Sequence, residues 1–192
     1  MLEEACRQAA GLHERTKGDH PLTVSVNLSV KQLQSETIVE DVRNALASSG
    51  LPPSSLVLEI TESVMMADTD LAVGRLHELK DLGILLAMDD FGTGYSSLSY
   101  LSRFPVDILK MDRAFLTKEH EDSGLAGAII AMGNSLNLEV VAEGIEFQEQ
   151  IGSLRDLGCE LGQGFFFAKP MSRDDLVEYL DTGLDEVAGS AA

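Results

Sequence analysis

The sequence predicts one α/β domain built as a partly complete, TIM-like (β/α)8 barrel. Three observations predict it: six short apolar runs, helix-like segments between them, and a polar residue at the end of each run. The runs cover residues 23–27, 56–59, 84–90, 106–110, 138–143 and 159–163. Parallel strands that are separated by helices point the same way, so their C-terminal ends gather on one face. We therefore expect the polar ends to form one rim.

Side-chain parity within the runs favours a barrel interior. Residues two apart on a strand share a face. In the run that begins at Leu56, one face carries Leu56, Leu58 and Ile60, whereas the other carries Val57 and Glu59. The runs at 23–27 and 84–90 repeat this pattern. A single polar strand end would only mark the start of a loop, but six ends with this parity indicate a functional rim.

The segments between the runs have helical patterns. We expect helices over 2–15, 36–49, 68–81, 95–102, 122–136, 146–157 and 172–182. Gly50, Gly83 and Gly158 stand where a helix ends and a strand follows, and Asp68 and Ser172 are candidate N-caps. We assign residues 1–183 to the domain and 184–192 to a flexible tail.

The strand count sets the barrel against one competing fold. A complete barrel has eight strands and about 250 residues, so this chain would lack two strands from an N-terminal portion of the domain. The competing fold is an open doubly wound sheet, for which six strands are complete. That fold places a glycine-rich turn after its first strand, and residues 27–31 contain no glycine.

Charge and composition narrow the class of protein. The formal net charge is −18, which argues against binding to nucleic-acid polymers. An anionic substrate would be repelled unless a bound metal ion reverses the local sign. No apolar stretch is long enough to span a bilayer. Cys6 and Cys159 are isolated, as expected of free thiols in a reducing cytoplasm. We therefore expect a cytoplasmic protein.

The predicted rim is rich in oxygen ligands. It collects Asn27, Glu59, Asp89, Asp90, Lys110, Glu143 and Gln163. Carboxylate and amide oxygens suit Mg²⁺ or Mn²⁺, and two such ions about 3.5–4 Å apart can bind a phosphodiester. Two neighbouring carboxylates such as Asp89 and Asp90 point to opposite sides of a strand, but both can reach metals if the strand is ending and the chain turns. The alternatives are a solvated acidic turn at Asp89 and a lysine at 110 that snorkels to solvent.

Two acidic residues outside the rim have no such support. Asp107 and Glu139 read as ordinary surface residues.

Six motifs resemble one family. They are Val26-Asn-Leu-Ser29, Glu59-Ile-Thr-Glu62, Asp89-Asp-Phe-Gly-Thr-Gly94, Leu109-Lys-Met-Asp112, Ala142-Glu-Gly-Ile-Glu146 and Gln163-Gly-Phe-Phe-Phe-Ala-Lys-Pro170. In order and type they are similar to the EAL family, bacterial phosphodiesterases and receptors for cyclic di-GMP. The resemblance covers residues 2–179. It implies a barrel whose first strand runs antiparallel to the rest.

The resemblance also implies a ligand set for metal. It assigns Asn27, Glu59 and Asp89 to a first divalent ion. Asp89 would bridge to a second ion, with Asp90 beside it as a metal ligand and catalytic residue. The cofactor implied is Mg²⁺ or Mn²⁺, as two ions in the complete site.

Further roles are implied for residues around the metals. Glu143 would bind or orient the attacking water, or complete the second metal site, and Lys110 would lie near the attacked phosphate and water. Gln163 would contact water or substrate. The implied supporting carboxylates, with Glu62 steadying the loop after Asp90, are Glu62, Asp112 and Glu146.

One departure from the family pattern bears on activity. The Glu-Ala-Leu string that gives the family its name, and an arginine that follows it, do not occur in this sequence. The first hypothesis is hydrolysis of cyclic di-GMP to linear pGpG, with turnover far below that of a complete domain. The alternative is an impaired module that binds cyclic di-GMP or a protein, or a merely structural domain. The partners expected are a second copy, docked through Phe91–Leu101, and regulatory domains of a longer parent.

Overall fold

The computed structural model describes residues 1–13, 22–62, 64, 69–92, 101, 103–116 and 124–182. These residues form one sheet of six strands in the order β1-β2-β3-β4-β5-β6. Every neighbouring pair is parallel. The strands are β1 (Val24–Asn27), β2 (Leu56–Thr61), β3 (Leu85–Phe91), β4 (Ile108–Met111), β5 (Glu139–Ala142) and β6 (Leu161–Gly162). The predicted parallel α/β fold with six strands is confirmed.

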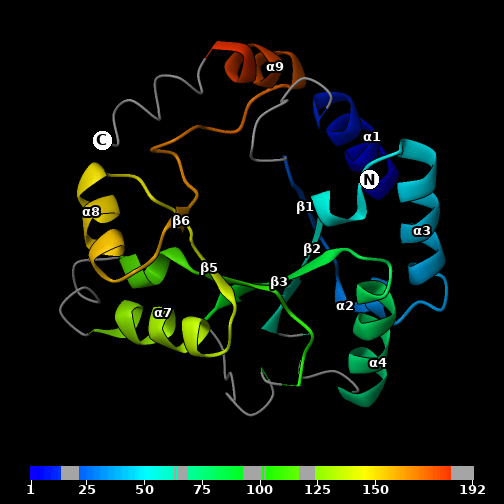
Figure 1. Ribbon diagram of the computed structural model, residues 1–192, viewed down its shortest axis with the longest axis horizontal. Coiled ribbons are helices and arrows are strands. Elements are labelled where there is room, and N and C mark those ends of the chain that lie inside the picture. Colours follow the sequence, from blue (N-terminus) through cyan, green and yellow to red (C-terminus); the bar gives the residue numbers. More distant parts are fainter. Residues whose placement is uncertain are drawn as a thin grey trace.

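Helices surround the curled sheet (Figure 1). They are α1 (Leu2–His13), α2 (Val30–Leu33), α3 (Ile38–Ser49), α4 (Thr69–Lys80), α7 (Leu125–Ser135), α8 (Gln148–Asp156) and α9 (Arg173–Thr182), with 3-10 turns at Pro53–Ser55 and Arg113–Leu116. Residues 95–100 and 102 of the helix expected over 95–102, and the proposed cap Asp68, lie outside the described residues. The short helix α2 was not predicted; Ser29 and Gln32 cap it reciprocally.

The predicted helix ends are confirmed where the structure describes them. Gly50, Gly83 and Gly158 have φ of 71°, 86° and 84°. Left-handed backbone of this kind favours glycine. At the start of α9, the hydroxyl of Ser172 accepts a hydrogen bond from the backbone N–H of Asp175 over 3.3 Å. The chain therefore turns from helix to strand at the predicted points.

The two faces of the sheet have separate cores. Leu56, Leu58 and Ile60 belong to a large cluster that the surrounding helices complete. Val57, Ala87 and Ile108 form a small cluster of their own. Parity predicted this inner face. Since side chains alternate along a strand, Glu59, Asp89 and Lys110, two positions beyond these three residues, continue the same face toward the C-terminal rim.

At the opposite end of the sheet, Asp107 forms a structural link. Both of its carboxylate oxygens lie 2.8 Å from Nζ of Lys80, and Oδ2 accepts from the backbone N–H of Leu86 over 2.8 Å. Lys80 also donates to the carbonyl of Ile84 over 3.0 Å. Asp107 therefore ties the end of α4 to β3, and its interpretation as an ordinary surface residue was wrong.

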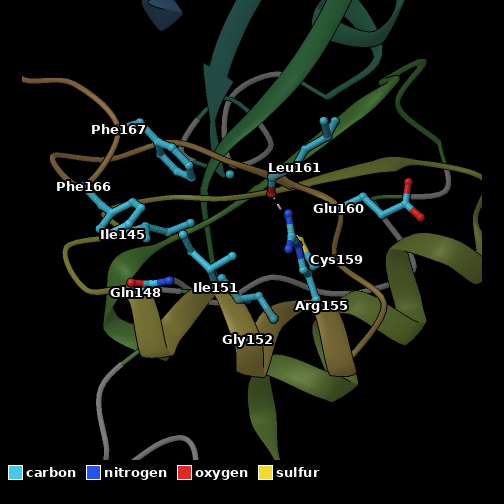
Figure 2. A pocket seen from close by; sticks show the side chains of 12 residues that line it. Ile145, Gln148, Ile151, Gly152, Arg155, Cys159, Glu160, Leu161, Phe166 and Phe167 are labelled. Carbon is cyan, nitrogen blue, oxygen red and sulfur yellow. Dashed lines mark hydrogen bonds between the residues drawn. The ribbon is translucent and has the colours of Figure 1, made fainter. Parts of the chain in front are cut away.

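The sheet formed by the described residues has two edges, β1 and β6. Beside β6 lies a mostly apolar hollow of about 380 Å³ against α8, and Figure 2 shows Ile151 of that helix facing it together with Phe166 and Phe167. Leu161 remains 42% exposed.

Across the gap between the two edges of the sheet, α9 approaches α1, where an Arg173 nitrogen comes within 3.9 Å of the Cβ position of Gly11 (Figure 1).

None of the helices in the described part of the chain has the length and apolar character that a membrane crossing requires.

Candidate active site

Strand register brings the predicted rim residues together. Asn27 pairs with Glu59 across β1 and β2, and Asp89 is the partner of Thr61 across β2 and β3. Glu143 follows β5, and its backbone N–H donates to the carbonyl of Met111 over 3.0 Å. Because all strands point the same way, their ends meet at one edge of the curled sheet.

A β-bulge places two neighbouring carboxylates in one cluster. The pairing of β3 with β4 shifts register between Met88 and Phe91, and Asp90 has a φ of 54°. A bulge re-aims side chains that a regular strand would send to opposite faces. The strand was expected to end at these aspartates, and β3 ends one residue later, at Phe91, before Gly92 with a φ of 96°. The bulge inside the strand was not predicted.

Three carboxylates at this rim could hold a cation. Ligand oxygens of Asp89, Asp90 and Glu143 all lie within 4.8 Å of one another. Asp89 and Glu143 are half-buried, whereas Asp90 is exposed. Oxygen-only donors of this kind fit a hard divalent cation such as Mg²⁺ or Mn²⁺. The fit rests on the chemistry of the donors and on their convergence.

Lys110 lies at the centre of the carboxylates. Its Nζ is 2.8 Å from Oε1 of Glu59, 2.9 Å from Oδ1 of Asp89 and 2.6 Å from Oε1 of Glu143. With 6% of its surface exposed, Lys110 is buried and does not snorkel to solvent. Burial alone would lower the pKa of Lys110, but the bonds to the three carboxylates outweigh it and raise the pKa. The side chain therefore stays a cation.

The acidic groups are crowded. Burial raises the pKa of Glu143, and the Lys110 ammonium only partly offsets this. The pKa of Asp90 is also raised, first because neighbouring protein atoms displace part of the water around its carboxylate, although the residue is exposed overall, and then by the negative charges of Asp89 and Asp112. Like charges held this closely disfavour ionisation unless a cation compensates them. The single positive charge of Lys110 therefore does not balance the negative charges of the carboxylates at this rim.

The remaining predicted site residues lie around the central carboxylates, and three of them form hydrogen bonds there. Gln163 donates through Nε2 to Oε1 of Glu143 over 2.6 Å. Oε1 of Glu62 accepts from the backbone N–H of Gly92 over 2.9 Å. Oδ1 of Asp112 accepts from the N–H of Ala114 over 2.8 Å. Glu146 is exposed at the margin. These contacts hold the described residues that directly follow β3, β4 and β5.

Two features of the site were missed by sequence reasoning. Gly144 has a φ of 69°, and a Cβ there would meet Cβ of Arg113 at 2.5 Å. A hollow of about 610 Å³ opens beside Glu143, where Arg113 and Lys169 bring positive charge and Phe165 brings an aromatic ring. The glycine that directly follows Glu143 was the available signal for the first feature. The hollow is lined by segments that lie far apart in the chain, so it has no local signal.

The predicted dimer segment Phe91–Leu101 lies mostly outside the described residues. Phe91 and Leu101 themselves are buried.

A protein-family model described as "EAL domain" matches residues 1–170. The chain is 43% identical over 183 residues to the cyclic di-GMP phosphodiesterase NbdA of Pseudomonas aeruginosa, covering 94% of this chain and 23% of NbdA. It spans between 20% and 26% of the length of the curated relatives it matches.

Solved structures agree with this match. The c-di-GMP complex of the phosphodiesterase PaMucR has a TM-score of 0.84 and 43% identity, covering 91% of this chain and 71% of that one. A manganese and cy-diGMP complex of BlrP1 from Klebsiella pneumoniae has a TM-score of 0.77 and 30% identity, covering 90% of this chain and 44% of that one.

Proposed function

Since this chain belongs to the EAL domain family, we propose that its rim residues hydrolyse cyclic di-GMP to linear pGpG in a metal-dependent reaction. One observation carries the proposal: Glu59, Asp89 and Glu143 converge on Lys110, with Asp90 beside them. Two relatives whose names describe them as phosphodiesterases, NbdA and PaMucR, are 43% identical to the chain.

We propose Mg²⁺ or Mn²⁺ as the cofactor, two ions in the complete site. Asp89, Asp90 and Glu143 would hold it, with Glu59 and Asn27 contributing from the neighbouring strands. A bound divalent ion lowers the pKa of a coordinated water and offsets the charge of a phosphodiester. The manganese complex of BlrP1 supports this choice of ion.

The chain's own groups have separate tasks in this proposal. Glu143, fixed by Gln163, orients the attacking water and accepts its proton. Lys110 stabilises negative charge as it develops on the phosphoryl oxygens. Arg113 and Lys169 offer positive charge to the dinucleotide, and Phe165 offers a face on which a base can stack.

A second candidate function is binding without turnover. It is favoured by one observation, since no Glu-Ala-Leu string occurs in the sequence and its glutamate is expected to be a metal ligand. Loss of one ligand changes the count and geometry on which metal chemistry depends. We therefore propose turnover well below that of a complete domain.

The test is a turnover assay with cyclic di-GMP and Mn²⁺, with products separated by chromatography. We expect pGpG from the unmodified chain, none after chelation, and at least about a hundredfold less from Asp89→Asn. Glu139→Gln, at the N-terminal end of β5, is the matched control and should keep full turnover. Binding without any product would favour the second candidate. The absence of both binding and product would contradict the two candidate functions.

We also propose a cytoplasmic setting, a homodimer and covalently linked regulatory domains. The buried free thiols Cys6 and Cys159 support the first, and the greater length of the relatives supports the last. The exposed apolar edge at Leu161 and Phe166 supports association. Light scattering after size exclusion tests the dimer. A protein that stays monomeric as its concentration is raised would contradict it.

A further inference from the structure

Two of the carboxylates that could hold a divalent cation are the ones that hold Lys110. The cation cluster consists of Asp89, Asp90 and Glu143. The ammonium of Lys110 lies 2.9 Å from Asp89 and 2.6 Å from Glu143. The third partner of the ammonium, Glu59, is outside that cluster. One lysine therefore binds two of the three carboxylates that a metal ion would need.

The burial of these groups makes the overlap consequential. The side chains of Lys110, Asp89 and Glu143 are 8%, 15% and 14% exposed. Water therefore reaches them poorly, and removal of one charge leaves its partners uncompensated. Oε1 of Glu143 already accepts from both Lys110 and Gln163, each over 2.6 Å. A cation that binds this oxygen would have to displace one of these donors or share the oxygen with them, and a cation on the other oxygen of Glu143 would lie close to the Lys110 ammonium.

We propose that the Lys110 ammonium is a built-in counter-ion that competes with the divalent metal for Asp89 and Glu143. In the metal-free protein the ammonium holds the carboxylates together. When metal binds, Nζ gives up its bonds to these two oxygens and becomes more accessible. The inference rests on the metal requirement of the proposed function, but it concerns affinity and the position of one side chain, not turnover.

The first test compares Mn²⁺ affinity by calorimetric titration of the metal-free chain. Lys110→Met removes the competitor, so Mn²⁺ should bind about tenfold or more tightly than to the unmodified chain, within the ~5–150-fold range of coupled ligands. Lys80→Met is the matched control. It removes the same charge from a lysine that is 26% exposed and paired with Asp107 far from the rim, and should leave the affinity unchanged.

A second test needs no substitution, which keeps the inference falsifiable if Lys110→Met fails to fold without metal. An amine-reactive ester is applied to the unmodified chain with and without Mn²⁺, and labelling is quantified by peptide mass spectrometry. Labelling of Lys110 should rise about tenfold or more with Mn²⁺ if the two cations compete, whereas Lys80, as internal reference, should not change.

The outcomes separate this inference from the proposed function. Weaker or equal Mn²⁺ binding by Lys110→Met, or labelling of Lys110 that Mn²⁺ leaves constant or reduces, would overturn the competition even if the unmodified chain hydrolyses cyclic di-GMP. Binding that appears only in Lys110→Met would support it. Lack of Mn²⁺ binding by either form would overturn the inference and the proposed metal site together.

Discussion

Gln163 donates through Nε2 to Oε1 of Glu143 over 2.6 Å, which joins the edge strand β6 to the acidic rim. Glu143 therefore receives one donor from the lumen side, Lys110, and one from the edge. Side chains that orient a ligating or catalytic carboxylate in this way tune its position and basicity. The position of Gln163 after the edge strand β6 therefore influences the position and basicity of Glu143.

We expect Gln163→Leu to lower metal affinity or turnover about 10–100-fold, because an orienting partner of Glu143 is lost. Calorimetry with Mn²⁺ and the turnover assay measure the effect. Gln148→Leu, at an exposed glutamine in α8, is the control and should change neither quantity. Equal values for the two variants would show that Glu143 is held without Gln163.

Gly144 should be more sensitive to alanine than Gly50. Both have positive φ, 69° and 71°, so both alanines incur roughly 1–2 kcal/mol of backbone strain. Only at Gly144 would the new Cβ meet Cβ of Arg113, at 2.5 Å, and nothing lies within 4 Å at Gly50. Gly144→Ala should cost about 1–3 kcal/mol more in urea unfolding and displace Glu143. Equal costs would contradict this assignment.

Asp107→Ala should lower the free energy of unfolding by about 1–3 kcal/mol, because the N–H of Leu86 and the ammonium of Lys80 lose their acceptor. Urea unfolding measures this change. Glu139→Ala, at an exposed carboxylate on the next strand, should cost less than about 0.5 kcal/mol. If Asp107→Ala matched this control, the link between α4 and β3 would have no energetic role.

The two thiols should react slowly in the native chain. Burial raises the pKa of both Cys6 and Cys159, so less thiolate is present at pH 8. A raised pKa also means that the stability gained from burying the neutral thiols is present below the unfolded pKa and falls as pH rises through the folded value. Ellman's reagent should titrate both only after denaturation. Fast native labelling of either thiol would contradict its burial.

Strand ends and parity predicted much of this site. Glu59, Asp89 and Lys110 follow the inner-face residues Val57, Ala87 and Ile108 at a spacing of two, so their common face could be read from alternation. Alternation says nothing of distances between strands. The three contacts of Lys110 depend on register and curl, which arise from tertiary packing.

The bulge at Asp90 and the link at Asp107 were beyond local patterns. A bulge adds a residue to one strand of a pair, so it depends on how β3 meets β4. Asp107 directly precedes β4, and its hydrogen-bond partners lie in α4 and β3, over 20 residues away in the chain. The helix α2, by contrast, had a local signal in the reciprocal pair Ser29 and Gln32.

Calorimetric titration of Mn²⁺ into Glu143→Gln and Glu139→Gln tests the central claim most directly. The two glutamates stand at opposite ends of β5, and the substitutions make the same chemical change. If the rim is the metal centre, Glu143→Gln loses Mn²⁺ binding about tenfold or more, while Glu139→Gln binds as the unmodified chain does. Equal affinity for all three proteins would contradict the assignment of this rim as the metal-dependent site.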